Sequence, residues 1–99
     1  MIIVTVKYSV KPGSRDEVLD LIRGYMAFSR TEKGCIAYDH LPNTDNDHEI
    51  IVLEKWEELD DLRAHIDAPE FTVFREKRAP YVVEGSMVRQ IYEATETDL

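Results

Sequence analysis

Two side chains that could carry acid–base chemistry, Glu54 and His65, lie near each other in the sequence, each among apolar residues. Glu54 alternates with Val52 and Trp56, so a strand there would place its carboxylate on an otherwise apolar face. Burial on such a face would raise the pKa of the carboxyl group or require a partner for it. His65 follows Leu62 by three residues, at the edge of the apolar stripe of a predicted helix. If both side chains face a cavity, His65 is the natural general base and Glu54 its orienter or proton relay.

Both residues also have an ordinary structural explanation. Glu54 is near enough to the end of its strand to reach solvent or an arginine, and His65 could be a solvated surface histidine. The aromatic residues Trp56, Phe71 and Phe74 could wall a slot for a flat aromatic ligand, although aromatic residues at this spacing also build cores. The sequence therefore predicts a candidate site and leaves open whether a cavity exists.

The other reactive residue types carry weaker signals. Cys35 has no C-x-x-C partner and is typical of a small buried hydrophobe. Strand alternation predicts that His40 shares a face with Ile36 and Tyr38, and His48 lies across a predicted hairpin turn from it. No H-x-H or H-E-x-x-H spacing supports a metal site at these histidines. The segment 45–47 lacks the glycine and the distant glutamate of a calcium loop. No glycine-rich phosphate loop, nucleophile elbow or dinucleotide fingerprint is present, so we expect neither a metal nor an organic cofactor.

Hydrophobic periodicity predicts a strand, a helix, a hairpin, a broken helix and a final strand. The predicted strands are 2–10, 35–41, 48–56 and about 86–93. The first helix should begin with a capping box of Ser14 and Glu17 and end before Gly34. The second should run over 59–66 and be interrupted before Pro69, which suits the first turn of another helix. This β-α-β-β-α-β order is typical of the ferredoxin-like α+β fold, with an antiparallel sheet and helices on one face.

The predicted strands are apolar on both faces, which bears on assembly. Val52 opposes Ile51 and Leu53, although helices are expected over only one face of the sheet. A chain of 99 residues buries only about two thirds of its unfolded surface, and an apolar sheet face left open is an interaction surface. We therefore expect a homodimer that closes sheet to sheet.

Composition limits the partners and the organisation of the chain. The 12 basic and 20 acidic residues give a formal charge of −8, which repels phosphate backbones and anionic lipid, so we expect neither nucleic acid nor a membrane as partner. The length suits one core, so residues 1–99 are expected to form a single domain with a core at about 2–93 and an acidic tail at 94–99. The first ten residues lack the features of a secretory signal, and one cysteine cannot form an internal disulfide, which favours the cytoplasm.

Three segments of the chain share a pattern with a known family. They are KPGSRDEVLDLI, EKGCIAYD and IIVLEKWEELDDLRAHIDAPEFTVF, the last containing the broken second helix. From about Val4 to Tyr92 the chain resembles the antibiotic biosynthesis monooxygenase (ABM) domain family, and Glu54, Trp56 and His65 lie where its small quinol monooxygenases have them. The resemblance implies a ferredoxin-like subunit, a dimeric barrel and a cavity between sheet and helices.

The resemblance also implies a function, the oxidation by O₂ of a quinol or hydroxylated polycyclic aromatic without a cofactor. On this hypothesis His65 is the base and Glu54 orients it or relays its proton. The expected substrate-binding residues are Tyr38, Trp56, Phe71 and Phe74. Haem cleavage, another activity of the family, is not expected, because the first strand has no Asn and the segment FREKR offers no His ligand. Two alternatives stay open: an isomerase of a small hydroxy-ketone, phosphorylated or not, on the same barrel, and a ligand-binding or stress-associated dimer without turnover.

Overall fold

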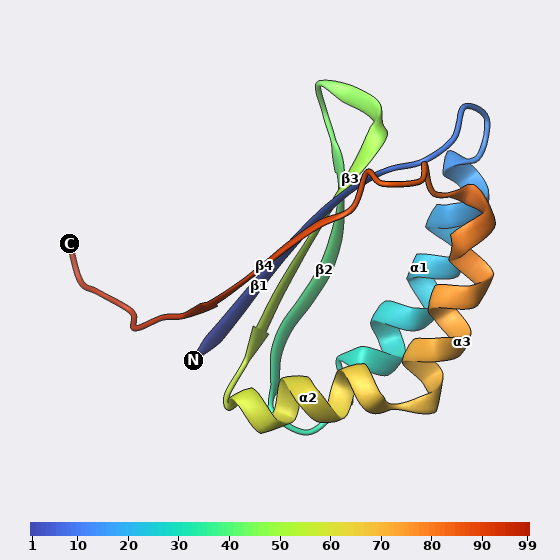
Figure 1. The fold of residues 1–99 in the computed structure, drawn as a ribbon. Coiled ribbons are helices and arrows are strands. Elements are labelled where there is room, and N and C mark those ends of the chain that lie inside the picture. Colours follow the sequence, from blue (N-terminus) through green and yellow to red (C-terminus); the bar gives the residue numbers. More distant parts are fainter.

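The computed structural model describes residues 1–99 and has the predicted order of strands and helices (Figure 1). The strands are β1 (Ile2–Ser9), β2 (Cys35–Asn43), β3 (Asn46–Trp56) and β4 (Val88–Glu93). The helices are α1 (Arg15–Ser29), α2 (Leu59–Asp67) and α3 (Pro69–Arg78), followed by the 3-10 turn η1 (Ala79–Tyr81). The ferredoxin-like α+β fold of the subunit is therefore confirmed.

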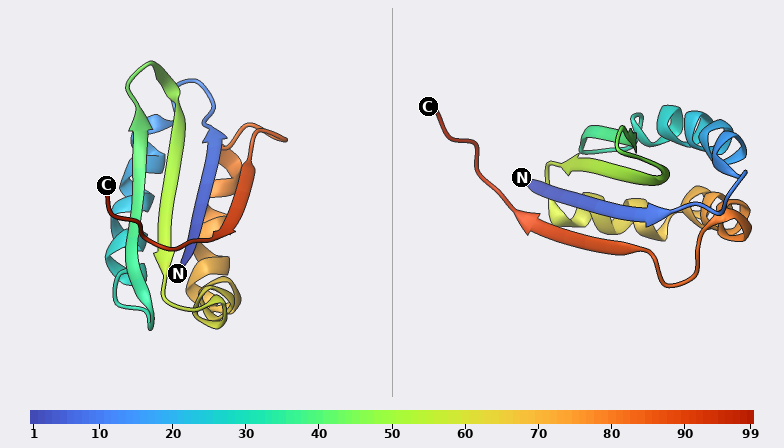
Figure 2. Two further views of the ribbon diagram at one scale, coloured as in Figure 1. Left: turned by 90° about the vertical axis from the view of Figure 1, so that its left-hand side faces the viewer. Right: turned by 90° about the horizontal axis from the view of Figure 1, so that it is seen from above.

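All neighbouring strands of the sheet are antiparallel, in the order β2-β3-β1-β4. Figure 2 shows the strands side by side with the helices behind them, so that one face of the sheet is covered and the other is open. Because β1 and β3 are the two central strands, their helix-facing side chains lie deepest in the molecule.

The covered face of the sheet carries the core. Every second residue of the two central strands is buried there, namely Ile2, Val4, Val6 and Tyr8 of β1 and Ile50, Val52, Glu54 and Trp56 of β3. The helices add Val18, Ile22 and Tyr25 of α1, Leu62 of α2 and Phe74 of α3. The strand alternation therefore places a carboxylate, that of Glu54, in a row of apolar side chains.

The opposite face of the sheet is partly apolar. The strand register places Ile3, Leu41, Ile51, Leu53, Val88 and Tyr92 on that face. Leu41, Val88 and Tyr92 are exposed. The sheet is thus apolar on both sides, as the sequence predicts, and helices cover only one of them (Figure 2).

A break between α2 and α3 turns the chain while keeping both helices on the covered face. Ala68 adopts an extended conformation (φ −65°, ψ 140°) that ends α2, and Pro69 begins α3. Proline suits the first helical position because the amide hydrogen it lacks would have no partner there. None of the helices combines the length with the apolar character that crossing a membrane requires.

Three local predictions are wrong. The hairpin turn is only two residues long, because β2 and β3 pair as far as Asn43 and Asn46 and the Asn43 side chain accepts a hydrogen bond from the backbone of the turn. Ser14 precedes α1, but its side chain makes no capping hydrogen bond. Ile36 does not share the buried face of His40, because a register shift at the start of β2 leaves Ile36 exposed.

Candidate active site

Glu54 lies at the centre of the covered face. Its Cα pairs with that of Val4 on one side and with that of Tyr38 on the other, and only 6% of the residue is exposed. Glu54 Oε1 accepts a hydrogen bond of 3.0 Å from the indole Nε1–H of Trp56. Burial raises the pKa of the Glu54 carboxyl group, and the hydrogen bond from Trp56 and the proximity of His65 oppose that rise without cancelling it.

His65 lies opposite Glu54, on the inward side of α2. Leu62 and His65, three residues apart, form the buried stripe that α2 lays on the sheet. The residue is 2% exposed, and its two ring nitrogens face different carboxylates. Nδ1 lies 2.7 Å from Glu32 Oε1, and Nε2 lies 3.7 Å from Glu54 Oε1. The structure therefore brings together the two predicted acid–base residues and adds a third group, Glu32, at the other ring nitrogen of His65.

That third group, Glu32, was not predicted from the sequence. It lies in the loop between α1 and β2, and its side chain is 15% exposed. Thirty-three positions separate it from His65, so neither helical nor strand periodicity links the two. Only the packing of α2 against this loop brings the pair together.

Gly34 makes that packing possible. Its φ of +78° belongs to the left-handed region that glycine adopts readily. A Cβ at this position would collide with the side chain of Asp61 in the first turn of α2. The Gly34 carbonyl also accepts a hydrogen bond of 2.8 Å from the backbone N–H of Glu57, just before α2. The start of α2 is thus held close to the loop that carries Glu32.

Aromatic rings surround His65. The ring centroids of Trp56, Tyr38 and Phe71 lie 4.7, 5.4 and 5.4 Å from that of the imidazole. Phe74, also predicted for the site, stacks instead on Tyr25, with centroids 4.1 Å apart and an interplanar angle of 3°. Three of the four predicted aromatic residues therefore pack against His65, and Phe74 lies one ring further away.

A cavity of about 50 Å³ opens beside these groups, between the sheet and helices α2 and α3. Its lining residues are Val4, Val6, Glu54, Leu62, His65, Ile66, Phe71, Arg78, Met87, Arg89 and Ile91. Glu54, His65 and Phe71 thus face the cavity, whereas Tyr38, Trp56 and Phe74 do not line it and support it from behind. A larger, open groove of about 470 Å³ between α1 and α3 contains neither Glu54 nor His65.

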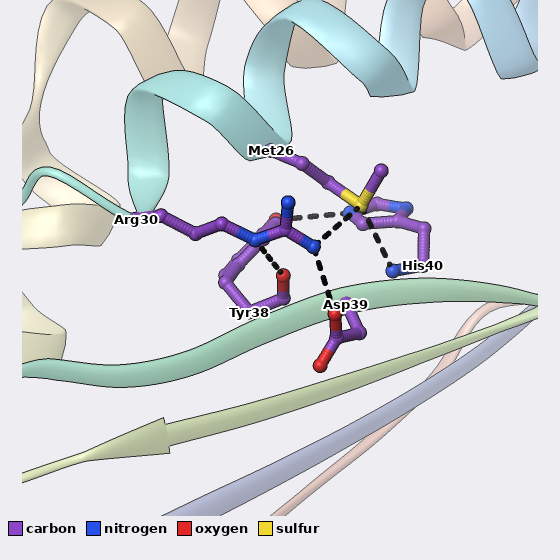
Figure 3. Close-up of polar contacts among 5 residues, drawn as sticks. All are labelled: Met26, Arg30, Tyr38, Asp39 and His40. Carbon is purple, nitrogen blue, oxygen red and sulfur yellow. Dashed lines mark hydrogen bonds and ion pairs between the residues drawn. The ribbon is translucent and has the colours of Figure 1, made fainter.

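The second buried histidine, His40, has different neighbours (Figure 3). Its Nε2 lies 3.1 Å from the hydroxyl of Tyr38, and its backbone N–H donates to Met26 Sδ at 3.3 Å. Arg30 at the end of α1 donates to the backbone carbonyl of Tyr38 and to Asp39 Oδ1. Burial, reinforced by the charge of Arg78, lowers the pKa of His40 to about 3, so this imidazole stays neutral at physiological pH.

The remaining predicted positions are structural. Cys35 is half-buried at the start of β2, and burial raises the pKa of its thiol, which disfavours the reactive thiolate. No group of three or more His, Cys, Asp or Glu side chains is arranged to hold a metal ion.

Comparisons with known proteins point to one family. The model of a family described as antibiotic biosynthesis monooxygenase matches residues 1–77. The chain is 29% identical over 96 residues to the uncharacterized protein sll1783 of Synechocystis, covering 97% of this chain and 65% of that protein. It therefore spans just under two thirds of that relative. It is also 29% identical over 74 residues to YcnE, a candidate monooxygenase of Bacillus subtilis, covering 75% of this chain and 78% of YcnE.

Solved structures with the same fold carry related descriptions. A candidate antibiotic biosynthesis monooxygenase from Nitrosomonas europaea superposes with a TM-score of 0.90 at 22% identity, covering 97% of this chain and 100% of that one. SnoaB, a cofactor-independent oxygenase from Streptomyces nogalater, superposes with a TM-score of 0.83 at 17% identity, covering 97% and 94%. At these identities the likeness is one of fold.

Proposed function

The chain belongs to the antibiotic biosynthesis monooxygenase family, and from that premise we propose that it oxidises a quinol or a hydroxylated polycyclic aromatic with O₂, without a metal or organic cofactor. The observation that carries the proposal is the contact series Glu32–His65–Glu54, buried in the core and opening on a cavity. The description of the structural neighbour SnoaB as a cofactor-independent oxygenase supports the same class of reaction.

In the proposed reaction a base removes a proton from the substrate before the substrate reacts with O₂. A neutral phenol or anthrone does not reduce O₂ readily, whereas its conjugate base does. His65 lines the cavity, and its Nδ1 is held by Glu32 while its Nε2 makes no hydrogen bond, so we assign Nε2 as the atom that accepts the substrate proton. Glu32 orients the ring and stabilises the imidazolium that forms, in the way a triad carboxylate does.

The oxygen step then balances without a further reactant. The deprotonated carbon of an anthrone, C₁₄H₁₀O, supplies electrons to O₂ and forms a C–O bond. The O–O bond breaks, the distal oxygen takes up two protons and leaves as water, and the product is anthraquinone, C₁₄H₈O₂. One oxygen atom of O₂ enters the product and the other enters water, and the substrate is the only electron donor.

We assign Glu54 to the second half of the proposed reaction, in which the O–O bond breaks. Because burial raises its pKa, Glu54 keeps its proton to higher pH than a solvated glutamate does. A protonated carboxyl group at the cavity wall can donate a hydrogen bond to a developing oxyanion or return a proton to the leaving oxygen. Trp56 fixes the orientation of the carboxyl group through its indole N–H.

Entry of an aromatic substrate requires the cavity to widen. A volume of about 50 Å³ is small beside the roughly 300 Å³ and more of ordinary ligand pockets. The outer wall is formed by side chains that are exposed, those of Met87, Arg89 and Ile91 on and next to β4. These residues can move aside at little cost in buried contacts, whereas the wall formed by Glu54 and His65 is fixed in the core.

We also propose that the protein is a homodimer joined through the open face of the sheet. The exposed residues Leu41, Val88 and Tyr92 support an apolar contact there. Leu53→Glu, which places a charge at the middle of that face, is expected to convert the dimer to a monomer in sedimentation velocity. A wild-type protein that sediments as a monomer would contradict this assembly.

Oxygen consumption tests the proposed function. An oxygen electrode should record uptake with a panel of naphthalene diols and anthrones at rates above their autoxidation, and His65→Ala should reduce that uptake by on the order of 10² or more. Turnover that persists under argon would favour an isomerase instead. Binding of the panel without uptake or turnover would favour a non-catalytic ligand-binding protein.

A further inference from the structure

Arg78 is a buried cation without an acidic partner. The residue is 7% exposed at the end of α3, and no carboxylate lies within ion-pair distance of its guanidinium. Its charged group lies between two aromatic rings, with the guanidinium carbon 4.8 Å from the centroids of both Tyr8 and Phe74. Aromatic faces attract a cation, but they do not accept the directional hydrogen bonds of five N–H donors.

The absence of a partner is specific to one part of the molecule. Of the seven arginines, Arg15, Arg23, Arg30 and Arg63 pair with aspartates. The three that pair with no carboxylate are Arg75, Arg78 and Arg89. The hollows that these three arginines line also include two acidic residues, Glu54 and Glu84, but neither carboxylate forms an ion pair with an arginine.

The three unpaired arginines line two neighbouring hollows. Arg78 and Arg89 line the cavity that contains Glu54 and His65. Arg75 and Arg78, together with Lys11, line an open groove of about 450 Å³ between α3 and the segment 79–87. Only Arg78 and Met87 line both hollows, so these two side chains separate them. Met87 is 43% exposed and can move, and its displacement would join cavity and groove.

A guanidinium that lines two hollows and has no ion-pair partner is a candidate site for an anion. Burying a charge without a hydrogen-bonded partner is costly, and a planar guanidinium matches the two oxygens of a carboxylate or the oxygens of a phosphate. The groove adds Lys11 and Arg75 to the attraction, and its one acidic lining residue, Glu84, forms no ion pair with them and offsets their charge only in part. The two hollows together form an inner space beside the proposed base His65 and an outer space lined by three cations and one carboxylate.

We propose that the substrate is an aromatic compound with an acidic substituent, whose ring occupies the widened cavity beside His65 and whose anionic group binds Arg78 in the adjoining groove. This inference rests on the proposed function for the identity of the reacting ring. It adds Arg78 as the residue that selects for the acidic substituent, and Arg75 and Lys11 as weaker contributors. Of the two anions, a carboxylate is the group we test.

The experiment compares two redox-stable probes that differ in the acidic group, 2-naphthoate and 2-naphthol, by isothermal titration calorimetry at pH 7. The wild-type protein should bind 2-naphthoate about tenfold or more tightly than 2-naphthol, the scale of one charge-assisted bidentate contact. Arg78→Gln should abolish that preference and Arg78→Lys should restore part of it. Arg75→Gln, at an exposed position, should reduce it about threefold, as expected for a partly screened charge.

Arg23→Gln is the matched control, because it removes an exposed arginine of α1 that lines neither hollow and should leave the preference intact. Equal binding of the two probes by wild-type protein would overturn the proposal. So would a preference that survives in Arg78→Gln with native near-ultraviolet circular dichroism. If Arg78→Gln does not fold, the Arg75→Gln result decides, and an unchanged preference there counts against the groove. A preference for naphthoate without oxygen uptake by any aromatic would overturn the proposed function and leave this inference standing.

Discussion

Two histidines are buried between the sheet and the helices, His40 on β2 and His65 on α2, and their surroundings differ in the sign of the nearby charges. His65 lies between the carboxylates of Glu32 and Glu54 and faces a cavity. His40 lies beside a tyrosine hydroxyl, near Arg78 and Arg30, and lines none of the hollows described above. Burial alone therefore does not separate the two histidines. The partners of their ring nitrogens support the catalytic role that we propose for His65 and a structural role for His40.

Met26 and Arg30 connect helix α1 to strand β2 in the region around His40. Arg30 joins the end of α1 to two consecutive positions of β2, and the Met26 sulfur accepts from the His40 backbone (Figure 3). These contacts fix the helix on the sheet. The His65 region instead has a ring nitrogen, Nε2, that makes no hydrogen bond, a carboxyl group with a raised pKa and an adjoining cavity. The first arrangement stabilises the fold, and the second suits proton transfer.

The largest expected effect comes from exchanging each histidine for glutamine. His65→Gln should lower kcat for oxygen uptake by roughly 10² to 10⁴, the usual contribution of a general base. His40→Gln should lower thermal stability, because it disturbs a buried hydrogen bond, and should change kcat by less than about threefold. Steady-state oxygen uptake and thermal denaturation of both variants check this. Similar losses of kcat in the two would remove the distinction drawn between the regions.

A smaller effect is expected at Glu32, which we regard as a positioning residue. Glu32→Gln keeps an oxygen acceptor near Nδ1 but removes the charge that stabilises an imidazolium, so kcat should fall by on the order of tenfold to 10²-fold with little change in KM. Asp39→Asn makes the same chemical change in the His40 region, where the carboxylate pairs with Arg30 at the surface. It should leave kcat within about twofold, as expected for an exposed ion pair. A rise in KM for Glu32→Gln with unchanged kcat would mean that Glu32 acts in binding.

Glu54 makes a prediction about stability and pH. Its folded-state pKa is raised by burial, so the folded protein holds this proton more tightly than the unfolded chain does, and stability from this group is lost as pH rises through the folded pKa. Glu54→Gln cannot ionise and should therefore gain thermal stability relative to wild type at pH 8 and not at pH 4. Melting curves at the two pH values measure the difference. A larger gain in thermal stability at pH 4 than at pH 8 would contradict a raised pKa of Glu54 in the folded protein.

The smallest expected change is that of His40 on acidification. Because its pKa is lowered from 6.5 to about 3, its imidazole proton resonances should stay constant in nuclear magnetic resonance spectra from pH 8 to about pH 4.5. As pH falls, the unfolded chain takes up this proton before the folded protein does. The contribution of His40 to the free energy of unfolding therefore decreases as pH falls from 6.5 towards 3. A titration of the His40 signals between pH 6 and 7 would contradict the lowered pKa.

The sequence predicts the fold well because the fold depends on local patterns. The alternation of Val52, Glu54 and Trp56 fixes which side chains of β3 face inward, and Pro69 marks the break between the last two helices. The same alternation places Glu54 in the core, and helical spacing places His65 opposite it. What failed locally, the cap at Ser14 and the face of Ile36, depended on details of backbone geometry that residue type alone does not determine.

The rest of the candidate site depends on contacts between distant segments. Glu32 reaches His65 only because Gly34 lets α2 pack on the loop before β2. Arg78 left a signal that could have been used, since it follows Phe74 by four residues and thus continues the inward stripe of α3. A buried arginine on such a stripe requires a hydrogen-bonding or acidic partner. The sequence cannot show whether a carboxylate lies close enough to be that partner. Only the position of the cavity separates the four aromatic residues predicted for the substrate slot: Phe71 lines it, and Tyr38, Trp56 and Phe74 do not.

The most direct test of the central claim, that His65 is the base of a cofactor-free oxygenation, is the oxidation of anthrone under ¹⁸O₂ by wild-type protein and His65→Gln side by side. Mass spectrometry of the anthraquinone formed gives both the rate and the origin of the new oxygen. The account predicts incorporation of one labelled oxygen per product by the wild type at a rate well above autoxidation, and a fall to the autoxidation rate in His65→Gln. Wild-type product formation at the autoxidation rate, or equal rates for the two proteins, would contradict it.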